Sequence, residues 1–169
     1  KRSSGSKRHN ESRQLGDRMN GFQNYPYKDI IHRCFRCGYC KFPLNWIDVN
    51  NCPPYARFSL ESYSCGGRLW LIRAYLKGDI SYSDHLGEII YSCTACRNCE
   101  IRCPLRFSSD IVNMVVAGRS FLVEEGKIPR TTKNFLTNVE LFGNPYGISQ
   151  RKRGQWADGE GIEKYDGHE

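Results

Sequence analysis

Apolar residues in the middle of the chain recur at the spacing of a helix. Leu69, Ile72 and Leu76 stand three and four positions apart within residues 68–77, which places them on one helical face. Gly78 follows them, and glycine commonly ends a helix because it adopts a left-handed backbone freely. We therefore expect an amphipathic helix whose apolar face lies in the core.

Helical patterns also occur in other parts of the chain. They cover residues 28–33, 84–91, 111–125 and 131–141. Ser83 and Ser108 stand near the starts of the second and third of these, where serine can cap a helix. A convincing alternation of apolar and polar residues, the mark of a half-buried strand, is missing. The fold class expected is therefore mainly α.

The composition limits the number of domains. A chain of 169 residues suits one domain with tails. Residues 1–24 are polar and basic, so we expect an N-terminal arm that would be disordered alone. Residues 148–169 are polar again and indicate a tail or linker, which leaves residues 25–147 for the domain.

No apolar run approaches the ~18–20 residues that a membrane span needs, and no signal peptide is recognisable. We therefore expect no direct membrane span. The location expected is the cytoplasm, either free or at the periphery of a membrane complex.

Nine cysteines supply the candidate chemistry. Cys93, Cys96 and Cys99 follow one another at intervals of three, and Cys103 precedes Pro104. Bacterial-type ferredoxins use such a run to hold 4Fe-4S clusters through soft thiolate ligands. Proline in that position suits the first turn of a following helix. Thiols so close in sequence are poorly placed for a disulfide framework, so we expect a reducing compartment.

The cysteine motif occurs twice. Its earlier copy consists of Cys34, Cys37, Cys40 and, after an insertion over residues 41–51, the pair Cys52-Pro53. Similarity extends further, because Gly67-Arg68 and Gly118-Arg119 follow the two Cys-Pro pairs at equal distance. We therefore expect a duplicated unit, in which one helix leads into a cluster loop and another leads away. Cys65 is left over and is expected to be a small, half-buried residue before the Gly66-Gly67 turn; the alternative is a redox or substrate-facing thiol near a cluster.

In two-cluster ferredoxins, the fourth cysteine of each run ligates the other cluster. Carried over, this crossing gives two ligand sets: Cys34, Cys37, Cys40 and Cys103, and Cys93, Cys96, Cys99 and Cys52. Each cluster would then hold the two halves together, so the protein without clusters should be unstable. The cofactors expected are two 4Fe-4S clusters, and no residue is expected to be catalytic.

The formal charge of +7 would suit a nucleic-acid-binding protein. That count treats cysteines as neutral, however, and thiolates on two oxidised clusters would lower it by about 4. A solvated basic surface or an acidic protein partner accounts for the remainder equally well. We expect no nucleic acid among the partners.

With both motifs identified, the chain resembles the helical dicluster iron–sulfur proteins represented by the C subunit of heterodisulfide reductase. Similar modules begin its D subunit and the iron–sulfur subunit of glycolate oxidase. The resemblance covers residues 29–147 and rests on Cys34, Cys37, Gly38, Cys40, Cys52-Pro53, Tyr55, Glu61-Ser62, Gly67-Arg68, Cys93, Cys96, Cys99 and Cys103-Pro104. It implies an α-helical ferredoxin fold with two pseudo-repeated cluster-binding units. Two departures are that Cys52 lies farther from its triple than in the family, and that Cys65-Gly66 stands where many relatives have Ser-Pro.

The resemblance implies an electron-transfer subunit of an oxidoreductase complex. Its two clusters would relay electrons between a flavin-containing, A-like subunit and a B-like subunit whose CCG domains reduce a disulfide. We find no CCG domain in these residues, so that site is expected on the partner. One alternative is the iron–sulfur subunit of a membrane-associated, quinone-linked oxidoreductase, such as glycolate oxidase or fumarate reductase. The least favoured is a zinc-binding nucleic-acid module, because a third cysteine three residues on fits a tetrahedral zinc site poorly.

Overall fold

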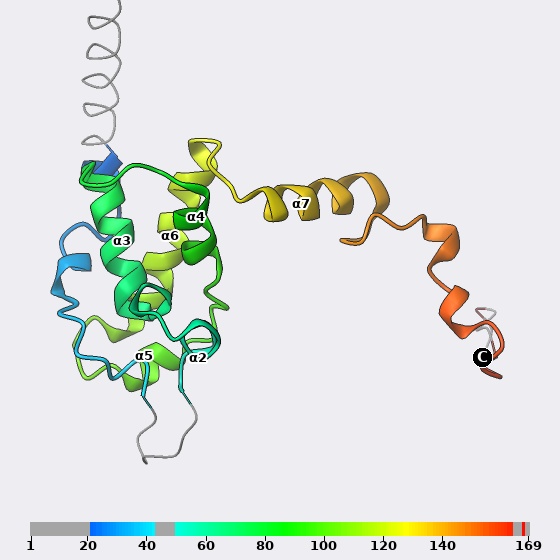
Figure 1. The fold of residues 1–169 in the computed structure, drawn as a ribbon, viewed down its shortest axis with the longest axis horizontal. Helices are drawn as coiled ribbons and strands as arrows, with labels where there is room; N and C mark the ends of the chain where they lie inside the picture. Colours follow the sequence, from blue (N-terminus) through cyan, green and yellow to red (C-terminus); the bar gives the residue numbers. More distant parts are fainter. Residues whose placement is uncertain (1–20, 43–49, 164–166, 168–169) are drawn as a thin grey trace, which may run out of the picture. The chain divides into compact units, whose positions relative to one another are not determined.

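A computed structural model describes residues 21–42, 50–163 and 167. Within these ranges the chain forms helices and loops and no strand, as the apolar spacing predicts (Figure 1). The contacts between Cα atoms divide the chain into two compact units, one ending at Ile128 and the other running from Pro129 to Glu169. We call them the cysteine unit and the C-terminal unit, and the division expected at residues 24 and 147 stays a prediction. Most of the expected N-terminal arm and residues 43–49 of the insertion lie outside the described residues.

Two helices, α3 (Cys65–Lys77) and α6 (Ile111–Glu124), form the centre of the cysteine unit. Leu69, Ile72, Met114 and Leu122 from these helices are almost fully buried, and α4 (Asp84–Tyr91) packs against both. The short helices α2 (Pro53–Phe58) and α5 (Asn98–Arg102) lie at one end of them (Figure 1). The cysteine loops belong to that same end of the unit.

The glycines of the two repeated Gly-Arg pairs, Gly67 and Gly118, lie where α3 packs closely against a neighbouring element. A Cβ at Gly67 would lie 2.0 Å from the carbonyl oxygen of Glu61, in the 3-10 helix η2 (Glu61–Tyr63). A Cβ at Gly118 would lie 2.8 Å from Cδ1 of Ile72, where α6 crosses α3. Both glycines therefore let neighbouring elements pack more closely than any other residue allows.

The helix ends follow local capping rules. Ser83 Oγ accepts a hydrogen bond from the backbone N–H of Leu86 at 3.1 Å and caps α4 as predicted. Gly78 takes a left-handed backbone (φ 80°) and ends α3, which also agrees with the sequence. Ser64 caps the start of α3 by accepting from Gly67 N–H at 3.0 Å, so this helix begins three residues before the apolar pattern indicates.

Other segments differ from the sequence prediction. Residues 28–33 contain only a 3-10 helix, η1 (Ile31–Arg33), preceded by turns. Ser108 provides no side-chain cap, and residues 108–110 form the 3-10 helix η3 (Ser108–Asp110), which leads into α6. Pro104 opens no helix, whereas Pro53 occupies the first position of α2.

The segment before η1 is joined to the core through Tyr25. Its side chain is 1 % exposed, and its hydroxyl donates a hydrogen bond to the carbonyl of Met114 at 2.6 Å. Burial raises the pKa of this phenol, so the hydroxyl stays protonated and able to donate. This contact links residues before the first cysteine triple to α6.

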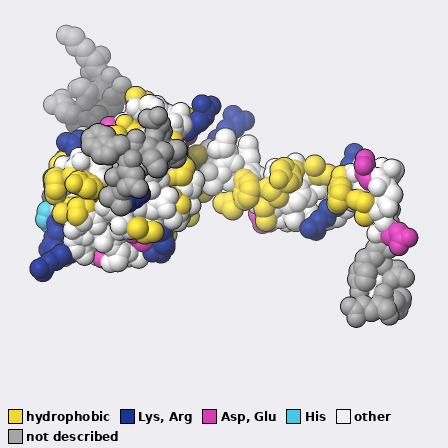
Figure 2. Space-filling model, turned by 90° about the horizontal axis from the view of Figure 1, so that it is seen from below, with side chains coloured by type: hydrophobic (Ala, Val, Ile, Leu, Met, Phe, Trp, Pro, Cys, Tyr) yellow, Lys and Arg dark blue, Asp and Glu magenta, His cyan; other side chains and the backbone are white. Residues whose placement is uncertain are grey.

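The C-terminal unit consists of α7 (Arg130–Phe142) and the 3-10 helices η4 (Gln150–Lys152) and η5 (Gln155–Ala157). Asn144 follows α7 and donates from Nδ2 to the carbonyl of Ile148 at 2.6 Å, which closes a compact turn. Apolar side chains gather on the face of this unit that Figure 2 presents, and those exposed include Phe135, Leu136, Val139, Leu141, Phe142 and Tyr146. Among the described residues, no helix has the length and apolar character needed to cross a membrane.

Candidate functional site

The first cysteine triple lies together with Cys103. A cavity in the cysteine unit is lined by five cysteines and by apolar residues that include Leu69, Phe107 and Ile111; the cysteines are Cys34, Cys37, Cys40, Cys65 and Cys103. Burial raises the pKa of the Cys103 thiol, and negative charge on Cys37 and Cys40 raises it further. Cys103 follows α5 and lies far along the sequence from the triple, so the chain folds back to bring these four thiols to one place.

The second triple runs from the end of α4 into α5, and Cys52 is reached from it through neighbouring residues. Cys93 comes just after α4, Cys96 is exposed, and Cys99 belongs to α5. Asn98 donates from Nδ2 to the carbonyl of Asn51 at 3.3 Å, which joins the start of α5 to the residue before Cys52. Cys52 is buried, and burial is the main reason why the pKa of its thiol is raised.

The two cysteine loops have the same backbone conformation at corresponding positions. Arg36 and Ala95, each two residues after the first cysteine of its triple, are left-handed with φ of 59° and 54°. Gly38 and Arg97, each one residue after the second cysteine, are left-handed with φ of 90° and 62°. Left-handed residues turn successive backbone N–H groups toward one side, and such concavities bind anions and iron–sulfur groups. The repeat seen in the sequence is therefore also a repeat of loop geometry.

A side-chain donor supports the first cysteine of each triple. The indole Nε1–H of Trp70, on α3, donates to the carbonyl of Cys34 at 2.6 Å. Arg119, on α6, donates from Nη2 to the carbonyl of Cys93 at 2.5 Å. The helix that carries the first Gly-Arg pair, α3, thus supports the first loop, and the helix that carries the second pair, α6, supports the second loop.

Arg68 joins Cys52 to the second loop and is 1 % exposed. Its Nε–H donates to the carbonyl of Ile89 at 2.9 Å, and Nη2 donates to Ser92 Oγ at 2.9 Å. Its Nη1 lies 3.9 Å from Sγ of Cys52. Sequence analysis assigned no role to Arg68 or Arg119, although the repeated Gly-Arg pair was a signal that could have identified both.

Cys65 lies between the two cysteine loops. It is the first residue of α3 and is 6 % exposed, so it is more buried than the half-buried residue expected. The thiols of Cys40 and Cys99, and then burial, raise the pKa of the Cys65 thiol. The hydrogen bond from Cys65 lowers the pKa of Cys40 to about 6. One buried thiol therefore contacts a cysteine of each triple.

The donor set fits two 4Fe-4S clusters in chemistry and in spacing. Soft thiolates are the ligands that iron–sulfur clusters take; cysteines converge on a cavity at the first site, and both loops have concave backbone. Within the described residues, no three His, Cys, Asp or Glu side chains converge closely enough for a single metal ion. A cube requires wider separation, because its ligands bind four different iron atoms.

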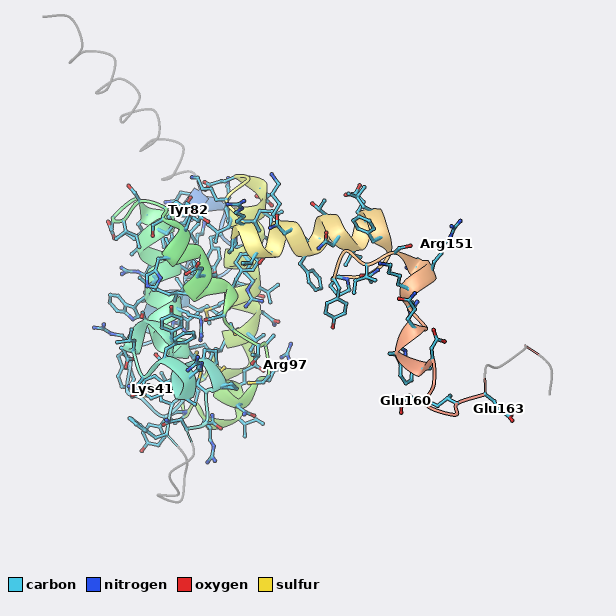
Figure 3. All side chains as sticks on the ribbon, turned by 45° about the vertical axis from the view of Figure 1, so that its right-hand side comes forward. Lys41, Tyr82, Arg97, Arg151, Glu160 and Glu163 are labelled. Atoms are coloured by element: carbon cyan, nitrogen blue, oxygen red, sulfur yellow. The ribbon has the colours of Figure 1, made fainter. Side chains whose placement is uncertain are left out.

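Two charged residues follow cysteines of the loops and lie toward the same end of the cysteine unit. Figure 3 shows Lys41 and Arg97, which follow Cys40 and Cys96, at the same end, and Tyr82 at the other. Lys41 is paired with Glu61 at 2.5 Å, and Arg97 with Glu100 at 2.8 Å. Both cations therefore have carboxylate partners near the surface.

Comparison with known proteins identifies the cysteine region. Residues 30–107 match the family described as 4Fe-4S dicluster domain. The chain is 38 % identical over 72 residues to the probable iron-sulfur-binding oxidoreductase FadF of Bacillus subtilis (strain 168), covering 42 % of this chain and 10 % of that protein. It is 33 % identical over 75 residues to the EtfAB:quinone oxidoreductase of Syntrophomonas wolfei, covering 44 % of this chain and 10 % of that protein.

A third relative is the glycolate oxidase iron-sulfur subunit of Escherichia coli (strain K12). It is 30 % identical over 105 residues, which cover 59 % of this chain and 22 % of the relative. The chain thus spans about a tenth to a fifth of the length of these three proteins. No solved structure matches the chain. The match, together with the helical fold, indicates a 4Fe-4S dicluster region over residues 30–107 whose cofactors are two 4Fe-4S clusters.

Proposed function

We propose that the chain relays single electrons between a flavin-containing partner and a partner whose CCG domains reduce a disulfide, as in heterodisulfide-reductase-like complexes. The observation that carries the relay is the position of Cys65, whose thiol contacts Cys40 of one triple and Cys99 of the other. A thiol that contacts one cysteine of each triple brings the two proposed cluster sites to the two sides of a single residue, which supports electron exchange between them. The clusters supply the redox chemistry, while the protein holds them at fixed positions and sets their potentials.

The ligands proposed are the two crossed sets. Cys34, Cys37, Cys40 and Cys103 hold one cluster, and Cys93, Cys96, Cys99 and Cys52 hold the other. The cavity lined by the first set supports this division, as do the contacts that join Asn51 to Asn98 and Cys52 to Arg68. Trp70 and Arg119 keep the loops in place by bonding the carbonyls of Cys34 and Cys93. No side chain has to act as an acid, a base or a nucleophile.

A second candidate is a unit of a quinone-linked oxidoreductase at a membrane. The printed names of two relatives, an EtfAB:quinone oxidoreductase and a glycolate oxidase subunit, favour it. In both candidates the chain works in the cytoplasm beside partner proteins. They differ in the molecule that exchanges electrons with the partner.

Purification of the natural complex under anaerobic conditions separates the two candidates. The proposal predicts a co-purifying flavoprotein and a CCG-domain protein, and reoxidation of the reduced clusters by a disulfide. Reoxidation by a quinone analogue and none by disulfides would favour the second candidate.

The crossed ligands are tested with Cys103→Ser, compared with Cys65→Ser as a matched control. The first variant should lose the cluster of the first triple and keep that of the second, whereas the control should keep both. Electron paramagnetic resonance (EPR) spectra distinguish these outcomes, and loss of only the second triple's cluster in Cys103→Ser contradicts the crossing.

A further inference from the structure

Arg68 is a buried charge without a carboxylate partner. Its guanidinium is 1 % exposed, and a guanidinium keeps its proton in proteins. Its bonded neighbours are the Ile89 carbonyl, the Ser92 hydroxyl and the Cys52 sulfur. Among the described residues, no Asp or Glu forms an ion pair with it. A buried cation in these surroundings is costly unless an anion lies nearby.

Cys52 is the neighbour that can supply the negative charge. As a cluster ligand it is a thiolate, and the oxidised cluster with its four thiolates carries a net charge of about −2. The guanidinium lies 3.9 Å from Sγ of Cys52, close enough for its charge to act on that sulfur. The bonds to Ile89 and Ser92 fix the guanidinium against α4, so it cannot turn toward solvent.

Among the described residues, the first cluster site has no arginine as buried as Arg68, and Lys41, which follows Cys40 with its side chain 12 % exposed, is already paired with Glu61. Trp70 supplies a neutral N–H to Cys34, where Arg119 supplies a guanidinium to Cys93. Arg36 is the arginine within the first triple, but it is exposed and lies over the Trp70 ring at 4.9 Å. The two halves of the repeat therefore differ in their arginines, because Arg68 and Arg119 donate hydrogen bonds to α4 and the second loop, whereas the first loop receives one from Trp70.

We propose that Arg68 makes the cluster of Cys52 and the second triple the higher-potential member of the pair. This inference rests on the proposed ligand assignment of Cys52. Reduction adds one negative charge, and a fixed buried cation stabilises that charge more than exposed cations do. A single electron that enters the pair at the first cluster then passes to the second. This transfer oxidises the first cluster and reduces the second. The order of potentials gives the relay a preferred direction, toward the second site.

Potentiometric titration of the full chain, monitored by EPR, tests the proposal. The iron content of the unaltered protein is measured first and should be about eight atoms per chain. A lower content rejects the proposed function, and this inference with it. With eight iron, Arg68→Gln should lower the ratio of reduced to oxidised second cluster about tenfold at a fixed potential, which is about 59 mV for one electron. The lower of the two reduction potentials is assigned to the first cluster. In Arg68→Gln it should stay within about 15 mV of its value in the unaltered protein, which is less than a twofold change in the ratio of reduced to oxidised first cluster.

Two further variants separate charge from structure. Arg68→Lys keeps the charge but loses the planar fork, so it should restore most of the potential. Arg97→Gln removes a cation from the second loop itself, yet Arg97 is 55 % exposed and paired with Glu100, so its effect should be below twofold. Equal shifts in Arg68→Lys and Arg68→Gln, or a shift of the lower potential, would overturn the proposal.

If Arg68→Gln cannot be isolated with both clusters, the proposal is tested on the unaltered protein instead. Paramagnetic proton NMR at half-reduction, with the cysteine β-protons assigned, shows which ligand set carries the electron. The proposal predicts Cys52, Cys93, Cys96 and Cys99, and reduction of the other set first overturns it.

Discussion

Gly67 and Gly118 occupy the same position in the two repeats but should respond differently to alanine. The added methyl at Gly67 would lie 2.0 Å from the carbonyl oxygen of Glu61 and 2.8 Å from its carbonyl carbon. These are backbone atoms, which cannot move unless η2 shifts away from α3. The methyl at Gly118 would meet atoms of Ile72, the nearest at 2.8 Å, and that side chain can change its rotamer.

The difference can be put into numbers. Overpacking a core usually costs about 1–3 kcal/mol, while alanine in place of glycine inside a helix gains up to about 1 kcal/mol. Gly118→Ala should therefore cost about 0–2 kcal/mol. Gly67→Ala should cost more than about 3 kcal/mol, because the clash involves backbone. For a chain of this size, each kcal/mol lowers the unfolding midpoint by about 2–4 °C.

The assay is thermal unfolding of the cluster-loaded protein, followed anaerobically by far-UV circular dichroism. The unfolding midpoint of Gly67→Ala should lie at least about 6 °C below that of the unaltered protein, or the variant should fail to load its clusters. The midpoint of Gly118→Ala should fall by less than that of Gly67→Ala. Ile72→Val removes Cδ1, the nearest atom to the new methyl, so it should lessen the effect of Gly118→Ala in a double-mutant cycle. The reasoning is refuted if Gly67→Ala is as stable as Gly118→Ala.

Three smaller changes test other contacts. Cys65→Ala should retain about eight iron per chain, since Cys65 is a neighbour of the ligands, and a loss of half the iron would make it a ligand. Trp70→Phe removes the hydrogen bond to Cys34 and leaves a carbonyl unsatisfied at about 1–3 kcal/mol, so a chelator should extract iron from the first site faster than from the second. Equal rates at both sites would contradict this. Tyr25→Phe removes the bond to Met114 and should cost about 1–3 kcal/mol in unfolding free energy, and an unchanged midpoint would show that the contact is not stabilising.

The sequence predicted those parts of the fold that depend on neighbouring residues. The start of α4 follows from Ser83 and the end of α3 from Gly78, because a cap is formed within one turn. Helix α5 was missed, since its five residues lie within the cysteine motif and show no apolar period. Pro104 was misplaced because the fixed φ of proline suits extended loops as well as first turns of helices.

The contacts around the clusters depend on tertiary structure and were beyond local patterns. Arginine is almost never fully buried, so nothing near Arg68 indicated that it lies against Cys52. Cys65 showed only as an unmatched thiol, and its position between the two triples depends on how α3 enters the space between the loops. The repeated Gly-Arg pair marked where to look without giving the contacts.

Iron and acid-labile sulfide, measured on protein purified anaerobically, test the central claim most directly. Two 4Fe-4S clusters predict about eight of each per chain and a brown protein. A colourless protein with zinc at its cysteines, or with no metal, would contradict the account.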